Sequence, residues 1–215
     1  MTNLFPPDHP PGFSHCASRL DIAEQRALVE AVAEALPTTP FFQPRMPRTG
    51  TPTSVVMTNF GSLGWVSDRE GGYRYQPRHP ETDAPWRPIP EVMLGLWQEF
   101  TDWPDLPECC LVNWYQPERA ARMGAHVDRD ELAVSAPILG VSLGDSATFR
   151  LGGLERGGKT LGVPLRSGDV VVMAGESRRR YHAVSRVDYG SSALLPEAVF
   201  PGGGRLNLTL RRVMP

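Results

Sequence analysis

The sequence has few cysteines, little net charge and no long apolar run. Its three cysteines, Cys16, Cys109 and Cys110, form no CxxC pair, which argues against structural zinc and favours a reducing compartment. The formal net charge of -2 requires no polyanionic partner, so any nucleic-acid contact must be local. Residues 1–7 lack the basic and apolar regions of a signal peptide, and no run approaches a membrane span. We therefore expect a cytoplasmic monomer with no membrane partner.

Proline and glycine, by contrast, are abundant: 22 and 21 of 215 residues. They separate short segments, which favours a β-rich fold with long loops. Residues 1–17 are Pro-rich and aperiodic, and we expect an irregular arm there. Two helices are also expected. Asp21 and Glu24 resemble a capping box for the first, which Pro37 ends, and Pro90 starts the second. Their core-facing residues are predicted to be Ile22, Gln25, Val29, Val32 and Leu36, then Met93, Leu96, Trp97 and Phe100.

The second half of the chain consists of short strand-like segments divided by turn sequences such as Ser167-Gly168-Asp169. This spacing is typical of a sandwich, jelly roll or barrel. At this length we expect one compact domain. After a strand at Ser54–Asn59, the predicted strands are Cys109–Tyr115, Ile138–Leu143, Thr148–Leu151, Val163–Arg166, Val170–Ala174, His182–Val187 and Leu206–Val213.

A histidine and a carboxylate, His126 and Asp128, stand two residues apart. In an extended chain both side chains project to the same side, so both can reach one metal ion. Two histidines and one carboxylate form the facial triad of non-haem iron(II) oxygenases, and His182, at the start of a predicted strand, supplies the second histidine. Alone, a His-x-Asp pair is more often an ordinary polar turn, and a lone His182 would be a structural histidine.

The last predicted strand alternates strictly. Arg205, Asn207, Thr209 and Arg211 face one side and leucines face the other. Two arginines on one face would suit a dicarboxylate, because guanidinium binds carboxylate bidentately, and a dicarboxylate that also chelates iron is 2-oxoglutarate. Asn113 and Tyr115 share a strand face and could add hydrogen bonds to it. The alternative is an amphipathic strand with a solvated polar face.

An aromatic and glycine-rich segment precedes the second helix. Trp65, Tyr73 and Tyr75 alternate with glycines and with Arg69, Arg74 and Arg78. Rings on a mobile support suit stacking on a planar ligand, with arginines for phosphate. The same rings could equally pin a hairpin to the core. Composition leaves both interpretations open.

Taken together, the motifs resemble the bacterial AlkB family of iron(II)- and 2-oxoglutarate-dependent dealkylases, in order from Met57 to Arg212. The matching residues are Met57-Thr58-Asn59-Phe60-Gly61 and Trp65; Gly72-Tyr73-Arg74-Tyr75; Asn113-x-Tyr115-x-Pro117; His126-x-Asp128-x-Asp130-Glu131; Pro137-Ile138 and Val141-Ser142-Leu143-Gly144; Phe149; Gly168-Asp169-Val170-Val171-Val172; Gly175-Glu176-Ser177-Arg178; Tyr181-His182; and Arg205-x-Asn207-x-Thr209-x-Arg211.

The resemblance implies a mainly β fold: a double-stranded β-helix, or jelly roll, with flanking helices and an N-terminal nucleotide-recognition lid. It divides the one domain into an arm, helix and loop (1–52), the lid with its supporting helix (53–108) and the catalytic core (109–215). It implies iron(II) on His126, Asp128 and His182, and 2-oxoglutarate on Asn113, Tyr115, Arg205, Asn207 and Arg211. Trp65, Tyr73, Asp130 and Met57 would contact the damaged base.

The implied reaction oxidises an N-methyl group on an adenine or cytosine (1-methyladenine or 3-methylcytosine type) in DNA or RNA. O2 is consumed, 2-oxoglutarate becomes succinate and CO2, and the methyl group leaves as formaldehyde. The base must be unpaired or flipped, because a methyl on a Watson-Crick nitrogen is otherwise unreachable. The substrate is therefore alkylated single-stranded or flipped-base nucleic acid.

Three positions depart from the family pattern: Glu118, Met173 and Ala183. They bear on substrate preference more than on metal binding. The same chemistry on tRNA, a protein side chain or a small molecule therefore stays an alternative. A non-catalytic, cupin-like metal-binding module is a further one, although it gives no reason for paired arginines on the last strand. The run Arg178 to Arg180 favours nucleic acid, unless it is a solvated turn.

Overall fold

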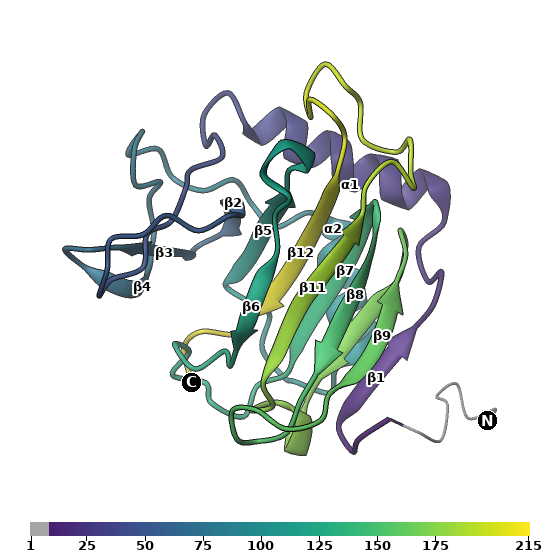
Figure 1. The fold of residues 1–215 in the computed structure, drawn as a ribbon. Coiled ribbons are helices and arrows are strands. Elements are labelled where there is room, and N and C mark those ends of the chain that lie inside the picture. Colours follow the sequence, from purple (N-terminus) through teal and green to yellow (C-terminus); the bar gives the residue numbers. More distant parts are fainter. Residues whose placement is uncertain (1–8) are drawn as a thin grey trace.

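Two antiparallel sheets face each other, and a small hairpin projects from one side (Figure 1). The computed structural model describes residues 9–215, so the first eight residues of the predicted arm lie outside the described part. The six-stranded major sheet has the order β1-β10-β7-β12-β5-β2 and the four-stranded minor sheet the order β6-β11-β8-β9. The predicted jelly roll is confirmed.

The strands of the major sheet are β1 (Phe13–Cys16), β2 (Val56–Gly61), β5 (Cys109–Tyr115), β7 (Ile138–Gly144), β10 (Val170–Met173) and β12 (Arg205–Arg211). Those of the minor sheet are β6 (Met123–His126), β8 (Ser146–Leu151), β9 (Leu161–Leu165) and β11 (His182–Asp188). The strands β3 (Gly64–Asp68) and β4 (Gly72–Gln76) form a separate two-stranded sheet, which we call the β3–β4 hairpin.

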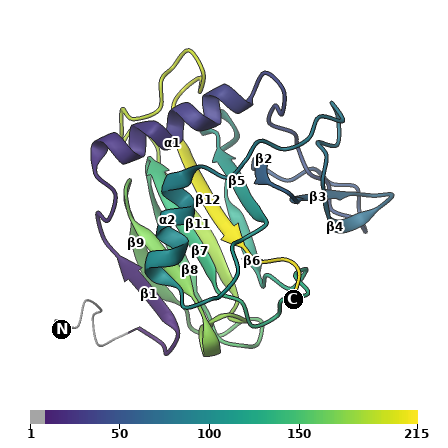
Figure 2. The ribbon, with the colours of Figure 1, turned by 180° about the vertical axis from the view of Figure 1, so that it is seen from behind.

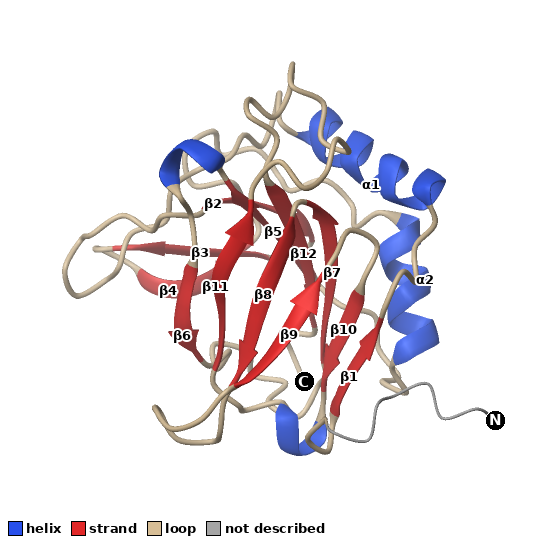
Figure 3. Cartoon of the chain, turned by 45° about the vertical axis from the view of Figure 1, so that its right-hand side comes forward, coloured by secondary structure: helices blue, strands red, loops and turns tan. Residues whose placement is uncertain are grey.

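Two helices, α1 (Ile22–Ala35) and α2 (Glu91–Phe100), lie on the side of the major sheet away from the minor sheet (Figures 2 and 3). The predicted capping box is present: Asp21 accepts from the Glu24 backbone, and the Glu24 side chain accepts from that of Asp21. Ile22, predicted to face the core, is 54% exposed. It is the first residue of the helix, and the buried stripe begins nearly two turns later, at Leu28 and Val29.

Alternation along the strands of the major sheet produces two apolar cores. Leu206, Leu208 and Leu210 of β12 point to the helices and pack with Trp97 of α2. The opposite face packs against the minor sheet, where Phe149 of β8 belongs to the second core. The polar residues of β12 therefore point between the two sheets.

Two strands were not expected from the sequence. β1, predicted as part of an irregular arm, pairs with β10 from Phe13↔Met173 to Cys16↔Val170. β6 pairs with β11 at His182↔His126. Each is four residues long, too short for alternation to stand out, and each is held by a partner distant in sequence. No helix of the described residues is long and apolar enough to cross a membrane.

Candidate iron and 2-oxoglutarate site

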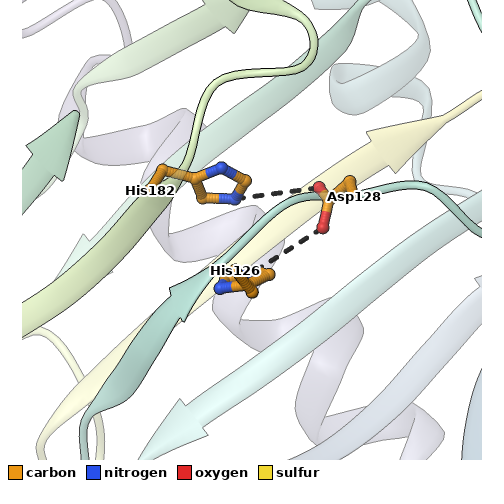
Figure 4. Close-up of side chains that lie close together, drawn as sticks. All are labelled: His126, Asp128 and His182. Atoms are coloured by element: carbon orange, nitrogen blue, oxygen red, sulfur yellow. Dashed lines mark ion pairs between the residues drawn. The ribbon is translucent and has the colours of Figure 1, made fainter. Parts of the chain in front are cut away.

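The minor sheet brings the three predicted metal ligands together (Figure 4). His126 ends β6, Asp128 follows in the next loop and His182 opens β11 opposite His126. Asp128 Oδ1 lies 3.5 Å from His126 Nε2, and Asp128 Oδ2 lies 3.9 Å from His182 Nε2. The ligand atoms all lie within 4.8 Å of one another. One ion can therefore contact all three.

Backbone carbonyls orient both imidazoles. His126 Nδ1 lies 2.8 Å from the Gly124 oxygen, and His182 Nδ1 lies 3.2 Å from the Arg180 oxygen. A carbonyl only accepts, so each Nδ1 carries the proton and each Nε2 presents its lone pair to the shared point. This is the tautomer that a metal-binding histidine needs.

The charge states also suit a metal. Burial lowers the pKa of His182 to about 4, which leaves a neutral imidazole. Burial alone would raise the pKa of Asp128, but Arg211, His182 and His126 outweigh it and hold that pKa well below its usual value. A neutral imidazole and an ionised carboxylate are the forms that coordinate metal. Two nitrogens and one carboxylate oxygen on one side of an ion match the iron(II) facial triad.

The major sheet brings the five predicted cosubstrate residues together. In the ladder between β12 and β5, Arg205 lies opposite Tyr115 and Asn207 opposite Asn113, and directly opposed residues share a sheet face. Arg211 stands at the other end of the same face of β12. Arg205 is fully buried and Arg211 is 7% exposed. A solvated polar face is thereby excluded.

Several buried polar atoms on this face have no hydrogen-bond partner within residues 9–215. They are Nε and Nη1 of Arg211, Nε of Arg205 and Oδ1 of Asn113. Buried polar atoms without a hydrogen bond are costly, so these donors and this acceptor mark a place where a ligand binds. Arginine donors at both ends of one strand fit a dicarboxylate, and Arg211 Nη2 is also 2.9 Å from Asp128 Oδ2. The residues present thus fit 2-oxoglutarate next to iron.

Two of the predicted substrate residues, Trp65 and Tyr73, lie on the β3–β4 hairpin, and the other two, Asp130 and Met57, lie in the loop after β6 and in β2. Trp65 Nε1 donates to Asp130 Oδ2 at 2.8 Å, and Trp65 stacks on Tyr73 with ring centroids 5.7 Å apart. Tyr73 is 47% exposed. Met57 is buried in β2 opposite Asn113. The hairpin therefore lies beside the loop that carries Asp128.

Three residues have a role at the site that the sequence did not predict. Ser142 Oγ accepts from Arg205 Nη2 at 2.7 Å and fixes that guanidinium. Glu131 and Arg178 form an ion pair of 3.0 Å, and both are buried. Arg178 is thus neither a nucleic-acid contact nor part of a solvated turn; only Arg179 of that run is exposed. Glu131 and Arg178 both stand in motifs that match the family, but the two residues are 47 positions apart, so nothing in the sequence indicates that their side chains pair.

Comparisons with known proteins agree with this geometry. The family described as the 2OG-Fe(II) oxygenase superfamily matches residues 14–211. The chain is 49% identical to an alpha-ketoglutarate-dependent dioxygenase AlkB homolog of Caulobacter vibrioides, over 94% of this chain and 88% of that protein. It is 39% identical to the alpha-ketoglutarate-dependent dioxygenase AlkB of Escherichia coli, over 88% and 84%. The solved structure of OsALKBH1 superposes with a TM-score of 0.74 and 27% identity, over 95% of this chain and 99% of that one.

The fold, the site and the family match define the class: the chain belongs to the 2OG-Fe(II) oxygenase superfamily and is an iron(II)- and 2-oxoglutarate-dependent dioxygenase. Within that class it is of the AlkB type, since two AlkB proteins match most of its length. The resemblance inferred from the motifs is confirmed. The human relative named nucleic acid dioxygenase ALKBH1 matches 37% of this chain at 44% identity.

Proposed function

We propose that the protein removes N-methyl groups from bases of the 1-methyladenine and 3-methylcytosine type in DNA or RNA. One observation carries this proposal: Trp65 of the aromatic hairpin donates to Asp130, two residues after the metal-ligand candidate Asp128. A planar base held by the hairpin would therefore lie beside the metal. The name of the human relative, nucleic acid dioxygenase ALKBH1, supports a nucleic-acid substrate.

His126, Asp128 and His182 would hold iron(II), and Arg205, Arg211, Asn113, Tyr115 and Asn207 would hold 2-oxoglutarate. Bound iron with 2-oxoglutarate and O2 supplies the oxidation: one oxygen atom enters a C–H bond of the methyl group, and the other enters succinate as CO2 leaves. The resulting N-hydroxymethyl group then leaves as formaldehyde: the C–N bond breaks, its electron pair stays on the ring nitrogen, and the hydroxyl proton passes to solvent.

The chain itself supplies recognition. A base methylated on a Watson-Crick nitrogen carries positive charge, which the Asp130 carboxylate and the faces of Trp65 and Tyr73 favour over the neutral base. Stacking on those rings offsets part of the cost of extruding the base, about a few kcal/mol. Met57 would close the pocket on its apolar side. We further propose a cytoplasmic monomer, since the three cysteines are free and every residue of the site comes from one chain.

The decisive experiment measures succinate and formaldehyde together. Purified protein is incubated with iron(II), ascorbate and 2-oxoglutarate, with or without single-stranded DNA that contains 1-methyladenine; unmethylated DNA is the control. We expect both products in equal amounts only with the methylated strand. Succinate without formaldehyde would point to another substrate, such as tRNA, a protein or a small molecule. Bound iron without succinate under any condition would favour a binding module.

The metal site is tested by His126→Ala. We expect this variant to lose most of its iron, because two of three protein ligands rarely retain the ion, and to form no formaldehyde. His15→Ala is the matched control: it removes an imidazole from the edge strand β1 and should leave the iron content unchanged. Metal analysis after desalting provides the measurement. Normal iron in His126→Ala would remove this histidine from the ligand set.

A further inference from the structure

One buried arginine holds the whole loop that carries Asp128 and Asp130. Arg178 Nη1 donates to the Asp128 carbonyl at 2.9 Å, its Nη2 to Glu131 Oε2 at 3.0 Å and its Nε to the Ala136 carbonyl at 2.7 Å. All three guanidinium nitrogens therefore bind one loop, at its start, middle and end. A planar fork of fixed geometry leaves this loop little freedom.

Glu131 is the junction of this arrangement. Its Oε2 accepts from Arg178, and its Oε1 lies 3.3 Å from Nε of Arg211. Arg211 in turn donates Nη2 to Asp128 Oδ2 at 2.9 Å. Glu131 is 4% exposed. A buried ion pair of this kind adds little net stability, because desolvation offsets the attraction, so its main consequence here is geometric.

The same Glu131 oxygen also receives a bond from the β3–β4 hairpin. Tyr75 of β4 donates its hydroxyl to Glu131 Oε1 at 2.5 Å. Burial raises the pKa of Tyr75 well above its usual value, so the hydroxyl remains a donor. Two rings of the hairpin thus contact the loop 128–136 directly: Trp65 at Asp130 and Tyr75 at Glu131.

We propose that Glu131, fixed by Arg178, is a positioning residue that couples the β3–β4 hairpin to the cosubstrate pocket. Glu131 Oε1 accepts from the Tyr75 hydroxyl and also faces Arg211. Movement of the hairpin therefore changes the orientation of the Arg211 guanidinium toward 2-oxoglutarate. Nucleic acid that seats against the hairpin then tightens 2-oxoglutarate binding. By linkage, 2-oxoglutarate tightens nucleic-acid binding by the same factor. The coupling between nucleic-acid binding and 2-oxoglutarate binding rests on the proposed function. The positioning of Arg211 by Glu131 does not.

The coupling is tested with Tyr75→Phe, which deletes one hydroxyl and keeps the ring. Affinity for 2-oxoglutarate is measured without O2 on iron(II)-loaded protein, with and without a single-stranded oligonucleotide that contains 1-methyladenine. In the wild type we expect the oligonucleotide to tighten binding about fivefold or more. In Tyr75→Phe the ratio should fall to near one. The matched control is Tyr189→Phe, which removes a hydroxyl bonded to the Ala121 carbonyl and should keep the wild-type ratio.

A wild-type ratio of one, or a wild-type ratio in Tyr75→Phe, would overturn the coupling. Formaldehyde release by the same preparations separates this failure from failure of the proposed function. Release without coupling rejects the coupling alone, and absence of release from the wild type rejects the substrate.

The positioning role has its own test, which needs no nucleic acid. Glu131→Gln keeps the shape of the side chain and removes its negative charge. Arg178→Lys keeps the positive charge and removes the planar guanidinium that binds three acceptors. We expect each to weaken 2-oxoglutarate binding by about tenfold or more, as is usual when a group that orients a metal-site residue is lost. Arg212→Lys is the control, since Arg212 likewise donates to several backbone carbonyls but at the chain end. Unchanged 2-oxoglutarate affinity in a folded Glu131→Gln protein would reject the positioning role.

Discussion

At the scale of single residues, the adjacent Arg211 and Arg212 point to opposite sides of the sheet and have different roles. Arg211 is 7% exposed and points between the two sheets, where its Nε and Nη1 make no hydrogen bond within residues 9–215, although Nε lies 3.3 Å from Glu131 Oε1. Arg212 points the other way and pairs with Glu108 at 3.3 Å. The alternation that predicted the polar face of β12 therefore also supplies a control within the chain.

We expect Arg211→Lys to raise the KM for 2-oxoglutarate strongly. Lysine keeps the charge but cannot bind a carboxylate bidentately or reach Glu131 and Asp128 at once. Loss of hydrogen bonds to a charged carboxylate costs about 2 kcal/mol, roughly a thirtyfold change in binding. Steady-state succinate formation against 2-oxoglutarate concentration measures it, with Arg212→Lys alongside. Equal KM values in the two variants would show that Arg211 does not bind the cosubstrate.

At the scale of elements, the edge strand β1 is tied to the turn before β10 by one carboxylate. Asp169 Oδ2 lies 2.9 Å from His15 Nε2 and accepts from the Arg166 backbone, and its Oδ1 accepts from the Ser18 backbone at 2.8 Å. Burial alone would raise the pKa of Asp169, but these bonds lower it below the usual value. The ionised form is therefore the one that the fold stabilises.

Asp169→Asn should lower the free energy of unfolding at neutral pH by about 1–3 kcal/mol, because the amide nitrogen cannot accept the bonds it replaces. The sign with pH follows from linkage. Because the pKa of Asp169 is lower in the folded protein than in the unfolded chain, where it is about 3.9, ionised Asp169 stabilises the fold above that pH. This stabilisation is lost as the pH falls through the pKa of the folded protein. The difference between variant and wild type should therefore shrink in acid. Urea unfolding at several pH values measures it; a pH-independent difference would contradict the assignment. Asp102→Asn, at an exposed position, is the control.

The elements also show which features a sequence can predict. Strict alternation in residues 205–211 is a local pattern, and it predicted both the strand and its polar face. The spacing of His126 and Asp128, two residues apart, is a local pattern as well. Glu131 and Arg178 are 47 positions apart, and neither lies on a periodic element, so only the fold reveals their contact. β1 escaped prediction for the same reason, since its pairing with β10 is a long-range property.

At the scale of the whole molecule, the site joins the two sheets. The metal-ligand candidates belong to β6, β11 and the loop between β6 and β7, whereas the cosubstrate residues belong to β5 and β12. The bond between Arg211 and Asp128 is a direct link between the two sets. A ligand that contacts both sets therefore bridges the faces of the jelly roll, and it binds the folded state alone.

Such a ligand should stabilise the fold. Manganese(II), which does not react with O2 as iron(II) does, can replace iron in this measurement. With both ligands at 100 times their Kd, 2-oxoglutarate adds about 2.7 kcal/mol to the stability of the metal-bound protein. For a chain of this size this raises Tm by roughly 5–10 °C. Differential scanning calorimetry measures the shift.

Glutarate is the control, because it has the same two carboxylates and lacks the keto oxygen that chelates the metal. We expect it to raise Tm less than 2-oxoglutarate when manganese(II) is present, and equally when the metal is removed by a chelator. His126→Ala should behave like the metal-free protein. If glutarate and 2-oxoglutarate gave equal shifts with metal bound, the keto acid would not bind across the two sheets, and the pocket on β12 would be separate from the triad.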